Sequence, residues 1–225
     1  MGSSRAMRAC RDLLAAAVLV CVAGCAADPG APRSGSSAST PASSHEAPRL
    51  SREADGGFTV TEVVRIDSDV RRDYQQALSM LQAGRLDEGI TLLESVTLRA
   101  PDVTIPHIDL GVAYARRDEL GKAEQSLETA LSLAPNHPAA LNEMGIVYRR
   151  SGRFDAARSS YERALAIHPG FHFALLNLGV LCDLYLQDLH CALTNYERYA
   201  EIVTDDDEVD VWIADIRNRL SATEE

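Results

Sequence analysis

The sequence lacks the motifs that mark the common classes of enzyme. It contains no Gly-x-Gly-x-x-Gly, no phosphate-binding loop, no His-Glu-x-x-His and no Gly-x-Ser-x-Gly. His168 and His172 lie four residues apart, but the Pro-Gly pair between them indicates a turn rather than one helical face. We therefore expect no catalytic residue, no metal, no cofactor and no small-molecule substrate.

Positive charge and aromatic residues are also scarce. The 22 Lys and Arg are outnumbered by 33 Asp and Glu, which gives a formal net charge of −11. Because nucleic-acid binding needs a basic patch, we expect no nucleic-acid partner. Aromatic residues make up only 5%, although a hydrophobic content of 46% is enough for a packed core. Three of the five cysteines fall within the first 25 residues, which excludes a disulfide framework.

The N-terminal stretch is basic and then apolar. Arg5, Arg8 and Arg11 precede an uncharged run over residues 13–24. This run is too short to cross a bilayer as a helix, which takes about 20 residues. A basic start followed by a short apolar run is typical of a secretory signal. The run ends in Val-Ala-Gly and is followed by Cys25.

This ending resembles the lipobox of bacterial lipoproteins. The resemblance implies that residues 1–24 are a signal peptide, that Cys25 is diacylated on sulfur after cleavage, and that its new amine is acylated. Several acyl chains hold a protein stably at a membrane, whereas one holds it only marginally. Ala26, in place of an aspartate, suggests the outer membrane, with the body facing the periplasm. The alternative is an ordinary signal peptide with a chance cysteine.

Residues 26–57 are dominated by Ser, Ala, Pro and Gly. Such a segment buries too little apolar surface to offset its ordering entropy, so we expect residues 25–57 to be a flexible linker. The next stretch, residues 58–66, is β-branched and partly alternating. It predicts a short strand with no obvious partner, within an arm over residues 58–69. This arm either lies extended on the first helices or adds to the sheet edge of a partner.

The rest of the chain repeats with a period of 34 residues. Gly111, Gly145 and Gly179 are 34 apart, and so are the prolines at 101, 135 and 169. Tyr114 and Tyr148 follow the first two of these glycines by three residues. Alanines recur in the same frame at 123 and 157, and at 130 and 164. A period of this length indicates stacked supersecondary units.

The pattern resembles the tetratricopeptide repeat (TPR), a helix-turn-helix unit. The resemblance implies an all-α superhelix over residues 70–205, in which glycine and alanine allow the paired helices to approach closely. Its repeats are 70–103, 104–137, 138–171 and 172–205. The first is degenerate, with Ala77 in the glycine place and Gly89 in the alanine place. The fourth needs one inserted residue, which we assign to its turn.

The end of the chain predicts a capping helix and tail over residues 206–225. Its apolar side chains form one helical stripe, and acidic residues precede them, where they suit the helix dipole. Cys182 and Cys191 fall on opposite helices of the fourth repeat. They either form a disulfide, as an oxidising periplasm permits, or pack as two small core residues.

The TPR resemblance also indicates a binding groove on the concave face formed by the first helices. Its floor is apolar, with three arginines in an otherwise acidic protein. Such a groove suits a peptide that carries acidic residues. The alternative is that four units barely make a groove and that Phe173 packs under the capping helix. The candidate groove residues are Tyr74, Ile108, Val112, Arg116, Asn142, Ile146, Arg149, Arg150 and Phe173.

These features predict a non-catalytic, membrane-tethered adaptor for envelope proteins. Blocks such as "LGVAYARR" and "VWIADIRNRL" are similar to TPR proteins that accompany TonB–ExbB–ExbD energy-transduction systems. Repeat lipoproteins of pilus assembly, which help the outer-membrane secretin to assemble, are the second setting. A scaffold that docks peptidoglycan hydrolases or proteases is the third.

Overall fold

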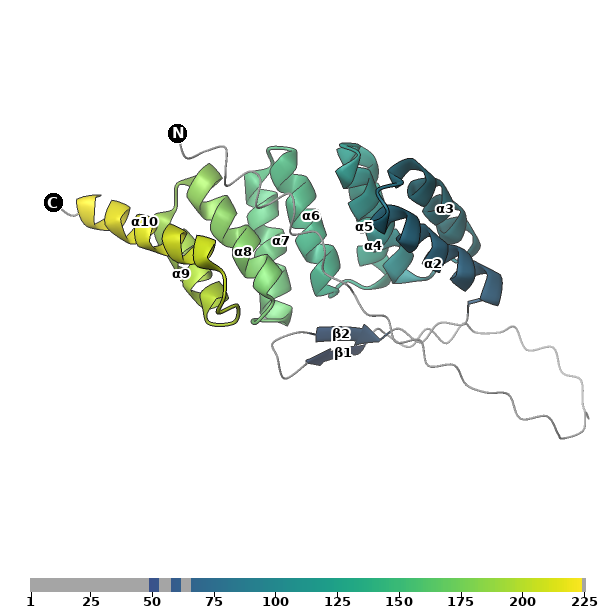
Figure 1. Cartoon of the computed structure of the whole chain (residues 1–225), viewed down its shortest axis with the longest axis horizontal. Coiled ribbons are helices and arrows are strands. Elements are labelled where there is room, and N and C mark those ends of the chain that lie inside the picture. The colour runs from purple at the N-terminus through teal and green to yellow at the C-terminus, as the bar shows by residue number, and fades with distance from the viewer. Residues whose placement is uncertain (1–48, 53–57, 62–65, 224–225) are drawn as a thin grey trace, which may run out of the picture.

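A computed structural model of the chain describes residues 49–52, 58–61 and 66–223 (Figure 1). The expectations for the signal peptide, for Cys25 and for most of the linker lie outside these residues. From residue 68 onward, helices follow one another in antiparallel pairs along the long axis of the molecule (Figure 1). The predicted all-α superhelix of about four repeats with a C-terminal cap is therefore confirmed.

Each repeat contains a first helix (A) and a second helix (B). The A helices are α2 (Ser68–Gln82), α4 (Thr104–Arg116), α6 (Pro138–Arg150) and α8 (His172–Leu181), which continues into the π-helical turn η1 (Cys182–Leu186). The B helices are α3 (Leu86–Arg99), α5 (Leu120–Leu133), α7 (Phe154–Ile167) and α9 (Leu189–Ala200).

The A and B helices of a pair approach closely because a glycine on one helix faces a large side chain of the other. A Cβ atom at Gly145 would lie 2.4 Å from the Tyr161 ring, so only glycine fits beneath that ring. The first repeat reaches the same proximity in the opposite order. Its A helix carries Ala77, which is fully buried, and its B helix carries Gly89, where a Cβ would lie 2.5 Å from Leu81. The degenerate repeat has thus exchanged the two small residues between its helices.

The A-to-B turns each contain one residue with a positive φ angle. These residues are Gly84, Asp118, Gly152 and Gln187, with φ of 76°, 64°, 74° and 56°. A left-handed residue ends a helix because it lets the chain reverse while the last carbonyls are still satisfied. The first three lie 34 residues apart, but the fourth comes after 35.

The extra residue lies in the A helix and not, as expected, in the turn. In the second and third repeats the Tyr114 and Tyr148 carbonyls accept from the amides of Glu119 and Arg153, five residues on. In the fourth, the equivalent Cys182 carbonyl accepts from Asp188, six residues on. The insertion therefore widens the last turn of the A helix into η1, as single inserted residues commonly do.

The stack is closed at its end by α10 (Asp207–Thr223). Val209, Ile213 and Ile216 are buried against the fourth repeat, with exposures of 1%, 7% and 0%. The Trp212 ring lies 5.5 Å from that of Tyr196. The expected apolar stripe is therefore core, and it covers a face that a fifth repeat would otherwise occupy.

Residues 58–61 form a strand that does have a partner. Strand β2 (Phe58–Thr61) pairs antiparallel with β1 (Arg49–Arg52), with Arg49 opposite Thr61 and Arg52 opposite Phe58. We expected no partner for this strand because the partner, β1, lies in the segment that the sequence predicts to be a linker. Within the described part of the chain, none of the helices combines the length and the apolar character needed to cross a bilayer.

Candidate functional site

The inner face of the stack is formed by the A helices. α4 contacts α6 and α6 contacts α8, in addition to the contacts that each makes with its own B helix. Successive A helices therefore meet along one side of the stack, and we take this side, lined by α2, α4, α6, α8 and η1, as its concave side. We call this surface the inner face.

A chain of polar side chains crosses the middle of the inner face. The Tyr74 hydroxyl of α2 donates to Asp109 Oδ2 of α4 at 2.5 Å. On α6, Asn142 Nδ2 donates to the neighbouring Glu143 Oε1 at 3.1 Å. Asn177 Nδ2 of α8 donates in turn to Asn142 Oδ1 at 3.1 Å. These hydrogen bonds join α2 to α4 and α6 to α8, and they engage the Asn142 amide that we expected to contact a peptide.

The two carboxyl groups of this chain of polar contacts have raised pKa values. Burial raises the pKa of Asp109 to about 6, although the hydrogen bond from Tyr74 opposes the shift. Burial raises the pKa of Glu143 to about 7, and the nearby Asp109 charge adds to this effect. The Asn142 hydrogen bond and the Arg116 charge act in the opposite direction on Glu143. Near neutral pH, the Glu143 carboxyl is therefore only partly ionised, whereas an ordinary glutamate has released its proton.

The three expected groove arginines have different surroundings. Arg150 donates from Nη1 to the Ala115 carbonyl at 2.5 Å and from Nη2 to Asp118 Oδ1 at 2.7 Å. It therefore holds the second and third repeats together. The guanidinium of Arg149 lies 5.8 Å from the centre of the Tyr185 ring. Arg116 is exposed, and its positive charge lowers the pKa of Glu143.

The expected apolar groove residues vary in accessibility. Ile108 is buried, with an exposure of 6%, whereas Val112 and Ile146 are half-buried on successive A helices. Phe173 is half-buried at the start of α8, where its ring lies 5.9 Å from Phe171. Val112, Ile146 and Phe173 thus keep apolar surface accessible, and Ile108 supports it from below.

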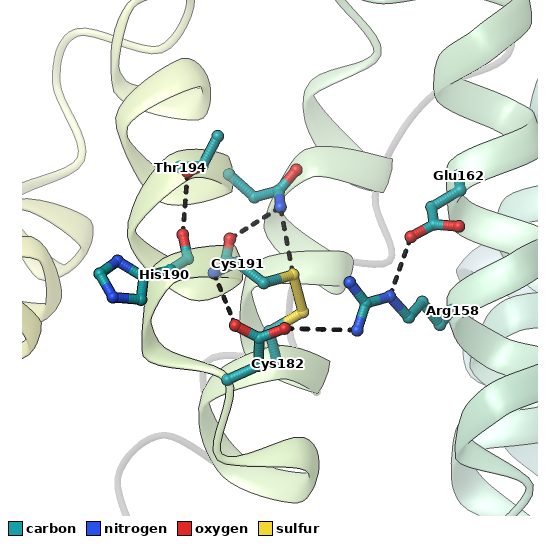
Figure 2. The surroundings of a disulfide bond; sticks show 8 residues. Arg158, Glu162, Cys182, His190, Cys191 and Thr194 are labelled. Carbon is teal, nitrogen blue, oxygen red and sulfur yellow. Dashed lines mark hydrogen bonds and ion pairs between the residues drawn. A yellow bond between two sulfur atoms is a disulfide. The ribbon is translucent and has the colours of Figure 1, made fainter.

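The cysteines of the fourth repeat, Cys182 and Cys191, form a disulfide in the structure (Figure 2). Cys182 is the first residue of η1, and Cys191 lies in the first turn of α9. Asp188 caps α9 by accepting from the Cys191 amide at 3.0 Å, and it also pairs with Arg158 of the third repeat at 3.3 Å. The bond therefore fixes the widened turn, and the adjacent ion pair joins it to the preceding repeat.

A hollow of about 460 Å³ opens beside this disulfide, on the B-helix side. Its walls come from α7, α8 and α9 and include Leu165, Leu178 and Asn195. Asn195 Nδ2 donates to the Cys191 carbonyl at 2.8 Å, and the Arg158 and Glu162 side chains pair with each other at 2.9 Å. The Asn195, Arg158 and Glu162 side chains of this hollow thus already have partners within the fold.

Sequence reasoning missed Asp109, Glu143 and Tyr185. A signal for the first two was present, because polar residues recur every 34 residues at positions 75, 109, 143 and 177. Residues at the same position of successive repeats lie close together where neighbouring A helices meet. No comparable signal existed for Tyr185, because its surroundings depend on how the inserted residue is accommodated.

Comparison with known proteins agrees with this architecture. Residues 102–169 match the tetratricopeptide repeat family, which covers the two clearest repeats. Proteins built on this fold generally act as non-catalytic scaffolds for protein partners. No curated protein sequence matches the chain.

Several solved structures share the fold at low sequence identity. Pseudomonas aeruginosa pilF has 19% identity and a TM-score of 0.62, with 68% of this chain and 69% of pilF covered. TTC0263, a thermophilic TPR protein of Thermus thermophilus, has 23% identity and a TM-score of 0.58 over 66% and 81% of the two chains. The first TPR of Spaghetti (RPAP3), bound to the HSP90 peptide SRMEEVD, has 21% identity and a TM-score of 0.50 over 52% and 93%.

Proposed function

We propose that this protein is a non-catalytic adaptor that binds a partner protein on its inner face. The observation that carries the proposal is the pair of half-buried apolar side chains at the same place of successive A helices, Val112 and Ile146, with the half-buried Phe173 nearer the start of the next A helix. These side chains lie on rigid helices, so their spacing is set before a partner arrives, which lowers the entropic cost of binding. A peptide occupies the similar fold of the Spaghetti domain.

The charges on the inner face favour a partner that presents both an acidic group and apolar side chains. Arg116 is exposed and attracts an acidic side chain, while Asp109 and Glu143 form a polar centre that resists additional negative charge. Arg150 is engaged between repeats and contributes stability rather than recognition. We therefore expect one acidic group of the partner near Arg116, with apolar side chains on either side of it.

We further propose that the adaptor works in the bacterial envelope, anchored to the outer membrane through lipid on Cys25 and facing the periplasm. The proposal is supported by the basic and apolar N-terminal pattern that ends at Cys25. The disulfide between Cys182 and Cys191 agrees with it, because disulfides persist in oxidising compartments.

The preferred setting is an accessory role in a TonB–ExbB–ExbD system, supported by the similar sequence blocks in the repeats and in the capping helix. Pilus and secretin assembly is the second candidate, and the shared fold of pilF favours it. Regulation of peptidoglycan hydrolases or proteases is a third use of the same surface. Deletion of the gene separates the first two settings, because one predicts loss of iron uptake and the other loss of twitching.

Anchoring is tested with a C-terminally tagged chain in its own host, compared with Cys25→Ser. We expect the wild-type protein in the outer-membrane fraction and Cys25→Ser either uncleaved or soluble. Identical fractionation of the two proteins would contradict the lipid anchor and leave a free periplasmic scaffold as the better proposal.

Binding is tested by crosslinking and co-purification of the same tagged chain. The double variant Val112→Glu/Ile146→Glu places charge on the apolar part of the inner face and is expected to remove the co-purifying partner. Val211→Glu is the matched control, because Val211 is 66% exposed on α10, away from the inner face. Retention of the same partner by the double variant, with its helix content unchanged, would refute binding on the inner face.

A further inference from the structure

The widened turn of the fourth repeat brings two cysteines and an aspartate together. Cys182 begins η1, Asp188 caps α9, and Cys191 lies in the first turn of that helix. Between them Gln187, with a φ of 56°, reverses the chain. The Cα atoms of the two cysteines are therefore only 5.8 Å apart. One donor atom from each of the three side chains lies within 4.8 Å of the other two.

When the two cysteines are thiols, this cluster offers the donor atoms of a metal site. Thiolate sulfur and carboxylate oxygen are both ligands of Zn²⁺, whereas Mg²⁺ and Ca²⁺ take oxygen ligands. The bond lengths of tetrahedral Zn²⁺ place its ligand atoms roughly 3.5–4 Å from one another. Reduction lets the two sulfur atoms separate toward this distance. The backbone thus already holds the three side chains at a spacing that suits Zn²⁺.

Neighbouring groups orient the donor atoms of this cluster. Asn195 Nδ2 lies 3.6 Å from Cys191 Sγ and donates toward it. Asp188 Oδ1 accepts from the Cys191 amide at 3.0 Å, and Asp188 Oδ2 accepts from Arg158 Nη1 at 3.3 Å. Hydrogen-bond partners of this kind accompany metal ligands and fix their orientation. Two thiolates and one carboxylate carry one more negative charge than Zn²⁺ neutralises, and Arg158, which also pairs with Glu162, places a positive charge beside them.

The hollow of about 460 Å³ gives an ion and a reductant a path to this cluster. Asp188 and Cys191 line the hollow, whereas Cys182 is fully buried. His190 also contributes to its wall, but the imidazole ring points away from the two sulfur atoms (Figure 2). The cluster therefore supplies three protein ligands and leaves the fourth position of a tetrahedral ion to water.

We propose that Cys182, Asp188 and Cys191 form a Zn²⁺ site when the disulfide is reduced. A two-electron reductant, such as a phosphine, breaks the S–S bond, two protons complete the thiols, and Zn²⁺ displaces these protons as it binds. Oxidation reverses the change: the thiolates give two electrons to the oxidant, the S–S bond forms and Zn²⁺ leaves. Reducing surroundings therefore favour the metal form and oxidising ones the disulfide.

The disulfide and the metal ion are thus alternative links between η1 and the start of α9. This inference goes beyond the proposed adaptor function and does not depend on it. It also differs from our expectation, based on sequence motifs, that the chain binds no metal.

The test uses the full-length chain, purified in detergent, reduced with tris(2-carboxyethyl)phosphine and freed of metal without oxygen. We expect the reduced chain to take one Zn²⁺ at this site in competition with a chromophoric chelator. Co²⁺ in its place should give the visible absorption bands of a tetrahedral thiolate site. The oxidised chain should give no such bands, and excess Mg²⁺ should not displace the bound ion.

Three variants identify the ligands. Cys182→Ser/Cys191→Ser keeps the three N-terminal cysteines and should abolish the Co²⁺ bands. Asp188→Asn keeps a good helix cap but removes the carboxylate, and should weaken Zn²⁺ binding by about tenfold or more. Asp206→Asn is the matched control, because Asp206 accepts from the Val209 amide at 3.3 Å at the start of α10, away from the cluster. It should leave the affinity unchanged.

Each alternative outcome has a separate meaning. Equal Zn²⁺ binding by the wild-type protein and by Cys182→Ser/Cys191→Ser would show an adventitious ion only and overturn the site. An Asp188→Asn affinity equal to that of Asp206→Asn would overturn the aspartate as a ligand and with it the proposed site. If reduction lowers the helix content seen by circular dichroism, Zn²⁺ should restore it in the wild-type protein but not in the double serine variant.

A rate measurement checks that the two forms exclude each other. Oxidised glutathione should re-form the disulfide of the reduced chain several-fold more slowly when Zn²⁺ is bound, because the metal holds both thiolates. An unchanged rate at saturating Zn²⁺ would contradict the site. Either result leaves the adaptor proposal standing, since that proposal is tested by substitutions on the inner face.

Discussion

At the residue scale, the Glu143 carboxyl illustrates a conflict between burial and charge. It lies on the inner face beside Asp109, and its pKa is raised to about 7. A carboxyl whose pKa is raised on folding favours the folded state most at low pH. Its contribution is complete below the ordinary value of 4.5 and is lost as the pH rises through about 7.

This conflict predicts the effect of Glu143→Gln. Above about pH 8 the variant should be more stable than the wild-type protein by roughly 2 kcal/mol, because position 143 no longer carries a buried charge beside Asp109. The difference should disappear as the pH falls toward about 5, where the wild-type carboxyl is protonated. Urea unfolding followed by circular dichroism across this pH range measures it. Glu128→Gln, on an exposed face of α5, is the control and should show no such trend.

The sequence foretold part of this residue-level picture. The period placed Tyr74, Asn142 and Arg150 on the A helices, but not their contacts. Arg150 was expected to face a ligand and instead bonds to the Ala115 carbonyl and to Asp118. A side chain of this length reaches several partners, and which one it meets depends on how the preceding repeat is positioned.

At the element scale, the helix pairs depend on glycine where an aromatic ring crosses. Gly145 on α6 lies beneath the Tyr161 ring of α7, and that ring is fully buried. The ring cannot move aside without disturbing the packing around it. The close approach of α6 and α7 therefore depends on both Gly145 and Tyr161.

Gly145→Ala is expected to lower the free energy of unfolding by about 1–3 kcal/mol, because the added methyl group overlaps the Tyr161 ring. The matched control is Gly121→Ala in α5, where an added Cβ has no neighbour within 4 Å. That change should be neutral or stabilise by up to about 1 kcal/mol, through the better helix propensity of alanine. Equal effects of the two substitutions, measured by thermal or urea unfolding, would disprove the steric explanation.

The inserted residue shows what an alignment of repeats leaves open at this scale. The sequence indicated that the fourth repeat holds one residue too many, and we assigned it to the turn. The structure keeps the left-handed turn residue, Gln187, and widens the helix before it. Both solutions satisfy the same period, and only the hydrogen bonds of the folded chain distinguish them.

At the scale of the whole molecule, each repeat is stabilised by the repeat or helix that packs beside it. No repeat can bury its apolar face alone, so the last one depends on α10. Ile216 is fully buried beneath this helix, whereas Val211 on the same helix is 66% exposed. A substitution at Ile216 therefore tests how α10 packs on the fourth repeat, whereas one at Val211 tests only the stability of the helix itself.

Ile216→Asp should lower the free energy of unfolding by about 3 kcal/mol or more, because it buries an unpaired charge. Hydrogen exchange should show lost protection mainly in α8 and α9, since each repeat contacts only its neighbours. Val211→Asp should leave the exchange pattern unchanged. A uniform loss of protection, extending to α4 and α5, would indicate that the stack unfolds as one unit and would contradict the nearest-neighbour description.

The sequence by itself determined the architecture of this protein, because a period of 34 residues with glycine, alanine and proline in fixed places describes a unit that must stack to bury its apolar face. It also determined the cap, since one apolar stripe follows the last unit. Only the tertiary structure decided which polar groups meet across repeats, how η1 accommodates the inserted residue and which strand pairs with residues 58–61. These features depend on contacts between residues far apart in the chain, whose partners are chosen by packing rather than by local pattern.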